Sequence, residues 1–204
     1  MNGVLLATAY FPPISWLAEI VKAGEWTLEA CEHFQKQSYR SRTEIFGPHG
    51  KQVLSVPVVR KVKDIHAVPV SYQENWVQDH LRAIETAYAN APFFEVLFED
   101  IRALLKREYQ TLWELNLATI ELYLDWLELD VSHGQTSSYE VQTALRDARH
   151  YHPKELTGIN FPEYQQVFKH KNGFLNNLSA LDLFFNLGRS SWDYLNELDL
   201  RVKS

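Results

Sequence analysis

The order of apolar segments and turn residues near the start of the chain constrains the fold most. An apolar run over residues 4–9 is followed by an apolar helical segment over 14–23 and by a second apolar run over 26–31. Pro12-Pro13 opens the helical segment and Gly24 ends it, and proline at the start of a helix and glycine just past its end are typical of helix boundaries. The pattern predicts a βαβ unit. Ligands of open α/β sheets bind at the carboxyl ends of the strands, where Tyr10 is expected.

The middle of the chain changes from strand signals to helix signals. Gly47-Pro48-His49-Gly50 separates two apolar runs, the second over 52–58, which is typical of a β-hairpin. Three helices with apolar residues at spacings of three and four are then predicted over residues 71–91, 92–105 and 111–127. The first and third begin with the spacing of a capping box, Ser71 with Glu74 and Thr111 with Glu114.

The C-terminal third has weaker signals. We expect a strand over 129–132, a helix over 139–149, an irregular stretch over 150–177 and two short helices on either side of Gly188. The chain is therefore predicted to be α/β, with α+β as the alternative. N-terminal βαβ and hairpin strands precede a mainly helical C-terminal half that packs on the sheet. No repeat or linker interrupts the chain, so we expect one domain over 1–204.

Composition excludes several classes of protein. A chain of 204 residues with 46% hydrophobic content can bury a substantial core, which excludes a disordered chain. Its formal net charge of -6 argues against general nucleic-acid binding, which needs a basic surface. No segment reaches the roughly 18 apolar residues of a membrane span, and no basic leader opens the chain. With Cys31 as the single cysteine, we expect a cytoplasmic protein.

A basic segment stands out in this acidic chain. If residues 38–45 form a strand, its two-residue period places Arg40, Arg42 and Glu44 on one face. Two guanidinium groups that point the same way suit a carboxylate or a phosphate. The segment therefore predicts an anionic small-molecule substrate. The alternative is a solvated strand face whose arginines pair with nearby acids.

Two further places could carry acid–base chemistry. The apolar C-terminal helix over 178–187 and its flank carry a polar stripe of Ser179, Asp182, Asn186 and Arg189. Either this stripe faces a pocket, where burial would tune the carboxylate as a general base, or Ser179 and Asp182 cap the helix. His80 lies on the apolar stripe of its predicted helix. It is either a packing contact of the core or an acid or base in catalysis.

Other chemistries have less support. Cys31 and His33 lie two positions apart, too far apart on a strand for a nucleophile and its base. His150, His152 and His170 have no cysteine or carboxylate at ligand spacing, so we predict no metal site. No glycine pattern for cradling phosphates follows the first strand, and the sequence identifies no cofactor.

Several separated segments, taken in order, resemble the WbqC-like protein family. They are Ala9-Tyr10-Phe11-Pro12-Pro13, Tyr39-Arg40-Ser41-Arg42, Gly50, Leu54-Ser55-Val56-Pro57-Val58, Trp76 with His80, Tyr88, Pro92-Phe93-Phe94, Asp147-x-Arg149, Tyr164-Gln165-Gln166-Val167-Phe168, Gly173-Phe174, Asn177-Leu178-Ser179, Leu181-Asp182 and Phe185-Asn186-x-Gly188. The family's basic motif usually reads Arg-Asn-Arg, and here Ser41, with a shorter side chain, replaces the asparagine.

The resemblance implies a bacterial protein of surface-polysaccharide (O-antigen) gene clusters, with a role as a glycine or other acyl-type transferase. The hypothesis that follows is transfer of an acyl or aminoacyl group to an amino-sugar substrate. The alternative is a non-catalytic protein that binds an anionic sugar nucleotide or assists a partner enzyme. In the transfer scheme, a phosphate or carboxylate is held by Lys36, Arg40 and Arg42. The substrate is oriented by Tyr10, Gln37 and Arg149. The attacking amine is deprotonated by His80 or Asp182.

Overall fold

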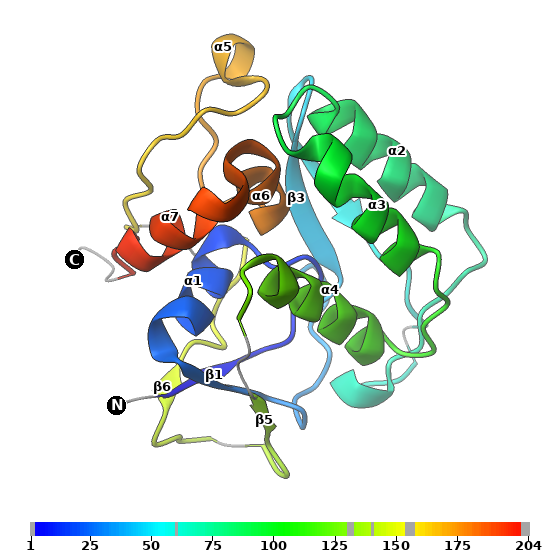
Figure 1. Cartoon of the computed structure of the whole chain (residues 1–204). Coiled ribbons are helices and arrows are strands. Elements are labelled where there is room, and N and C mark those ends of the chain that lie inside the picture. The colour runs from blue at the N-terminus through cyan, green and yellow to red at the C-terminus, as the bar shows by residue number, and fades with distance from the viewer. Residues whose placement is uncertain (1–2, 60, 130–132, 140, 154–157, 201–204) are drawn as a thin grey trace.

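The computed structural model describes residues 3–59, 61–129, 133–139, 141–153 and 158–200. It confirms the predicted mixed α/β class, with a parallel sheet of four strands and a separate antiparallel hairpin. Helices lie mostly in the second half of the chain. In Figure 1 the strands of the parallel sheet lie at the bottom. Strand β3 (Arg42–Gly47) of the hairpin lies between α6 (Ala180–Leu187) and α2 (Trp76–Tyr88).

The parallel sheet contains the predicted βαβ unit. Its strands, in spatial order, are β5 (His133–Gln135), β2 (Glu25–Leu28), β1 (Gly3–Leu6) and β6 (Arg146–Asp147), and every neighbouring pair is parallel. Helix α1 (Ile14–Ala23) connects β1 (Gly3–Leu6) to β2 (Glu25–Leu28) and ends at Gly24, whose φ of 71° is a left-handed conformation open to glycine. All four residues of β1 are buried, as expected for a central strand of a parallel sheet.

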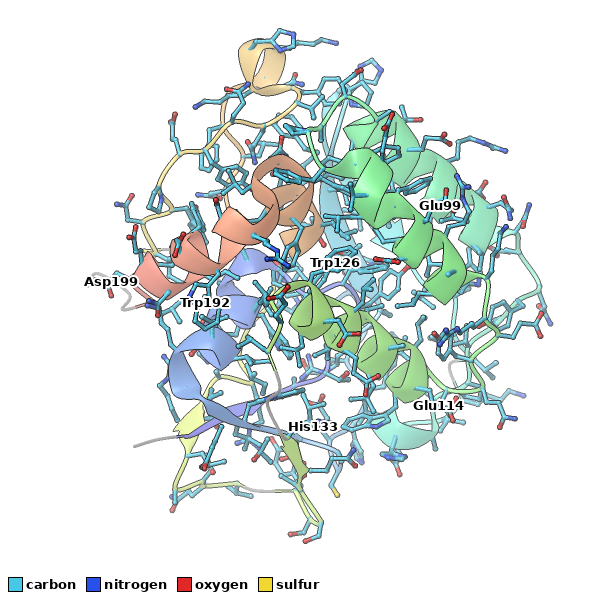
Figure 2. The ribbon with its side chains drawn as sticks, viewed as in Figure 1. Glu99, Glu114, Trp126, His133, Trp192 and Asp199 are labelled. Carbon is cyan, nitrogen blue, oxygen red and sulfur yellow. The ribbon has the colours of Figure 1, made fainter. Side chains whose placement is uncertain are left out.

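Two short segments complete this sheet. The helix predicted over 139–149 is wrong: the described residues of this stretch contain strand β6 (Arg146–Asp147), which pairs with Val4 and Leu5. Of the strand predicted over 129–132, residues 130–132 lie outside the described residues. Strand β5 (His133–Gln135) begins immediately after them, and the ring of His133, labelled in Figure 2, stacks on Trp26 at 4.7 Å.

The hairpin consists of β3 (Arg42–Gly47) and β4 (Gly50–Ser55). The prediction of a strand from residue 38 is wrong, because residues 38–41 form turns. The Ser38 hydroxyl donates to the Gln35 carbonyl at 2.7 Å, and the Ser41 N–H donates to the Ser38 carbonyl at 3.3 Å. Gln37 has a φ of 60°. These turns reverse the chain just before β3.

The predicted helices are present, with one different start. They are α2 (Trp76–Tyr88), α3 (Phe94–Leu105) and α4 (Leu112–Trp126), and a short 3-10 helix η1 (Ile65–Ala67) precedes them. The capping box of Thr111 and Glu114 is confirmed. The one predicted for Ser71 and Glu74 is wrong, since α2 begins only after Asn75 and has no side-chain cap.

Two of the C-terminal helices cover α1. The C-terminal elements are α5 (Lys169–Asn172), α6 (Ala180–Leu187), the 3-10 helix η2 (Gly188–Ser190) and α7 (Ser191–Glu197), and both α6 and α7 contact α1. Trp126 joins α4 to this layer, because its ring meets Phe184 of α6 at 5.1 Å (Figure 2). Its N–H also donates to Asp100 of α3 at 3.0 Å. In the described part of the chain, no helix has the length and apolar character needed to cross a bilayer.

Candidate functional site

Polar residues gather where the parallel strands end. Because all four strands run the same way, the residues that follow them meet at one edge of the sheet. Backbone hydrogen bonds from these residues extend the strand pairing: Glu29 N–H to the Leu6 carbonyl at 2.8 Å, Thr136 to Leu28 at 3.0 Å and Ala148 to Leu5 at 2.8 Å. The side chains at this carboxyl edge are therefore held on a rigid frame.

Glu29 is the centre of the first cluster at this edge. Its side chain is fully buried, and one carboxylate oxygen accepts from the Thr136 hydroxyl at 2.6 Å and from the Cys31 N–H at 3.0 Å. Its other oxygen accepts from Arg149 at 2.9 Å. Arg149 in turn donates twice to Asp147, at 3.0 and 2.6 Å. One guanidinium thus joins two carboxylates that follow different strands.

The charges of this cluster reinforce each other. Hydrogen bonds from Arg149 lower the pKa of Asp147, and the same bonds raise the pKa of Arg149. The exposed ring of Tyr139 lies 5.1 Å from the guanidinium carbon, in a cation–π arrangement. Both groups therefore remain ionised across the physiological pH range.

A second ion pair lies beside the first cluster. Arg40 donates to Glu32 through Nε at 2.6 Å and through Nη2 at 2.5 Å, and the two side chains are only 2% and 5% exposed. Asn116 holds the Arg40 backbone by donating to its carbonyl at 2.8 Å. This bidentate geometry leaves the N–H groups of Nη1 without a partner among the described residues.

These two clusters surround one cleft of about 380 Å³, here called the edge cleft. Its lining consists of Glu32, Gln35, Arg40, Tyr139, Asp147, Arg149, His150, Tyr151 and His152. The cleft combines carboxylates, guanidinium groups and imidazoles. It also lies where α/β proteins bind ligands, at the carboxyl edge of the sheet.

A second cleft of about 490 Å³, here called the basic cleft, is lined by other residues of the 34–42 segment. Its lining consists of Phe34, Lys36, Gln37, Ser41, Arg42, Ser55, Val56, Pro57, Val58, Ser71, Gln73 and Glu74. The prediction that Arg40 and Arg42 share one strand face is therefore wrong. Arg40 lies in the turn before β3 and lines the edge cleft, whereas Arg42 begins β3 and lines the basic cleft.

Tyr10 and His80 lie together but line neither cleft. The Tyr10 hydroxyl is 3.0 Å from His80 Nδ1, and the two side chains are 0% and 5% exposed. Burial lowers the pKa of His80 to about 4, although a hydrogen bond with the Ser55 backbone favours the protonated ring. His80 is therefore neutral at physiological pH, and Tyr10 donates to Nδ1 of the neutral ring.

Replacing Tyr10 with phenylalanine is expected to lower the free energy of unfolding by about 1–3 kcal/mol, because buried Nδ1 of His80 loses its donor. Urea unfolding followed by tryptophan fluorescence measures the change. Tyr139→Phe removes the hydroxyl of an exposed ring, which makes no hydrogen bond among the described residues, and is the control. A Tyr10→Phe change no larger than that of the control would show that His80 finds another donor.

Asp182 lies in the core rather than in a pocket. It is fully buried on α6, and one carboxylate oxygen accepts from the Tyr164 hydroxyl at 2.5 Å and from Gln166 at 2.8 Å. Of the two alternatives for the polar stripe, the cap is confirmed for Ser179, which is the N-cap of α6. Arg189 pairs with Glu128 at the surface. Neither cleft includes a member of this stripe.

The structure thus divides the eight predicted site residues. Lys36, Gln37 and Arg42 line the basic cleft, Arg40 and Arg149 line the edge cleft, and Tyr10, His80 and Asp182 are in the core. Sequence reasoning missed Glu29 and Glu32. A signal was available, because Glu29 lies near the end of the strand predicted over 26–31 and Glu32 follows it, and the carboxyl end of such a strand should face a ligand. In the described ranges, no group of three or more His, Cys, Asp or Glu side chains is placed to hold a metal ion.

Comparison with known proteins gives one match. A model of the WbqC-like protein family matches residues 8–152, which include the lining of both clefts. No curated protein and no solved structure matches the chain. The matched region is more than two thirds of the 204 residues. The chain therefore belongs to the WbqC-like protein family.

Proposed function

We propose that this protein is a transferase that moves an acyl or aminoacyl group, with glycyl as one option, onto the amino group of a sugar in bacterial surface polysaccharide (O-antigen) biosynthesis. The observation that supports this most is the edge cleft, which places guanidinium groups, carboxylates and imidazoles around one volume. Such a site can bind an anionic donor and a cationic amine acceptor at the same time.

The proposed reaction is a direct transfer. The amine nitrogen attacks the carbonyl carbon of an activated donor, the new C–N bond forms, and the bond to the leaving group breaks. The amine proton passes to a general base. Arg40 offers its Nη1 N–H groups to an anionic group of the donor, while Asp147 attracts the amine.

His150 is the proposed base. It is exposed, lines the edge cleft and stacks on Tyr151 at 5.0 Å, so its ring orientation is constrained. His80 and Asp182, the bases predicted from sequence, have no direct access to this cleft. Imidazole is the side chain used most often as a general base in enzymes.

The test supplies purified protein with nucleotide-activated amino sugars and with acyl or aminoacyl thioesters, and detects the acylated sugar by mass spectrometry. We expect His150→Gln to lower turnover by about 100-fold or more, since a general base contributes that factor. His170→Gln, on exposed α5, is the matched control and should keep full activity. Undiminished turnover in His150→Gln would remove His150 from the mechanism.

The same panel separates the transferase from the non-catalytic alternative. Binding of a nucleotide sugar, measured by calorimetry, without product from any donor would favour a binding protein. Binding that persists in His150→Gln while turnover is lost would favour the enzyme, because a general base acts on the reaction and contributes little to affinity.

A further inference from the structure

We propose that the basic cleft is a separate binding site for the phosphate group of a small phosphorylated molecule, with Lys36 and Arg42 as its charged contacts. The site lies outside the edge cleft and does not depend on the transfer reaction. Its lining contains two cations and one carboxylate, Glu74, in a protein whose formal net charge is -6. The lining of this cleft therefore carries a net positive charge, although the protein as a whole is negatively charged.

The two cations of this cleft have no internal partner. In the edge cleft, by contrast, each arginine makes an ion pair with a carboxylate, Arg40 with Glu32 and Arg149 with Asp147. In the parts of the chain that the structure describes, the side chains of Lys36 and Arg42 make no hydrogen bond and no ion pair. Lys36 is exposed and Arg42 is half-buried, so both remain available to a ligand.

The frame around these cations is rigid. The Phe34 N–H donates to the Lys63 carbonyl at 2.6 Å, and the Val56 N–H donates to the Ser41 carbonyl at 2.9 Å. Arg42 pairs with Ser55 at the open end of the hairpin. Backbone pairing thus fixes both walls of the cleft before a ligand arrives, which reduces the entropy lost on binding.

The number of donors favours phosphate over carboxylate. Arg42 carries five N–H donors and Lys36 carries three, and Gln37 and the serines Ser41, Ser55 and Ser71 add an amide and hydroxyl groups to the lining. A carboxylate presents two oxygens, whereas a terminal phosphate presents three and a higher charge. The apolar residues Phe34, Val56, Pro57 and Val58 line the same cleft and leave room for the organic part of the molecule.

Inorganic pyrophosphate is the probe for this site, used on the full chain with isothermal titration calorimetry at low salt. We expect saturable binding to the wild type, and affinity at least about tenfold weaker in the double variant Lys36→Ala/Arg42→Gln, which lacks both charge-assisted contacts. Lys51→Ala/Arg82→Gln removes the same two charges from surface ion pairs outside this cleft and should bind like the wild type.

Three results would overturn the proposal. The first is the absence of saturable pyrophosphate binding to the wild type. The second is an equal loss of pyrophosphate affinity in both double variants, which would show non-specific attraction. The third is citrate binding as tight as pyrophosphate binding, which would show a carboxylate site. Near-UV circular dichroism checks folding, and the single variant Lys36→Ala, at an exposed position, repeats the test if Arg42→Gln is unfolded. His150→Gln should bind pyrophosphate normally, so failure here is distinguishable from failure of the transferase assignment.

Discussion

Replacing Glu32 with alanine is expected to lower the free energy of unfolding by about 3–5 kcal/mol, because it leaves the Arg40 guanidinium buried without a counter-charge. Arg40 is 2% exposed and both of its hydrogen bonds to Glu32 are lost together. Glu32 and Arg40 also flank the 34–37 turn, which contributes to both clefts. Urea unfolding measures the loss, and we expect ligand binding at both clefts to weaken with it.

Two controls isolate the buried charge as the cause. Glu99→Ala breaks an ion pair with Arg102 at the surface of α3 (Figure 2), and should change the free energy of unfolding by less than about 1 kcal/mol. The double variant Glu32→Leu/Arg40→Met removes both charges and should recover most of the stability, since a packed apolar pair often equals a buried ion pair. A small loss in Glu32→Ala alone would mean that water reaches Arg40.

Asp182 is expected to make stability depend on pH between about pH 4 and 7. Burial raises its pKa from 3.8 to about 6, even though hydrogen bonds from Tyr164, Gln166 and Tyr88 act in the opposite direction. A carboxyl group whose pKa is higher in the folded protein stabilises it fully below the unfolded pKa. That stabilisation is lost as pH rises through the folded pKa, and the shift corresponds to roughly 3 kcal/mol.

Asparagine at position 182 cannot ionise and removes this dependence. The free energy of unfolding of Asp182→Asn, relative to the wild type, should therefore rise by up to roughly 3 kcal/mol between pH 4 and pH 8. Urea titrations at a series of pH values measure it. Asp193→Asn, on the exposed side of α7, should follow the wild type at each pH. A flat difference for Asp182→Asn would mean that the carboxyl group has the same pKa in the folded and unfolded chain.

Elements with a local signal were predicted well. The βαβ unit follows from Pro12-Pro13 and Gly24, which fix the ends of α1 through their own backbone preferences. The capping box of Thr111 and Glu114 is another local interaction, and it formed as predicted. Strand β6 was missed because a two-residue strand has no periodicity, and its hydrogen bonds come from β1, about 140 positions earlier.

The basic segment shows where local reasoning failed. Tyr, Thr and Ile content favoured a strand from residue 38, but the Ser38 hydroxyl bonds to the Gln35 carbonyl and forms a turn instead. Burial of Arg40 against Glu32 then directs its side chain away from Arg42. Two arginines that the sequence placed in one site therefore line two clefts.

The sequence by itself determined the class of fold and most of its elements, because these depend on neighbouring residues and on strand direction. Only the tertiary structure decided which charges are neutralised. Arg149 reaches Glu29 across 120 positions, and no local pattern encodes that contact. Because a charge is available to a ligand only if folding leaves it unpaired, the paired edge cleft and the unpaired basic cleft could not be told apart from sequence.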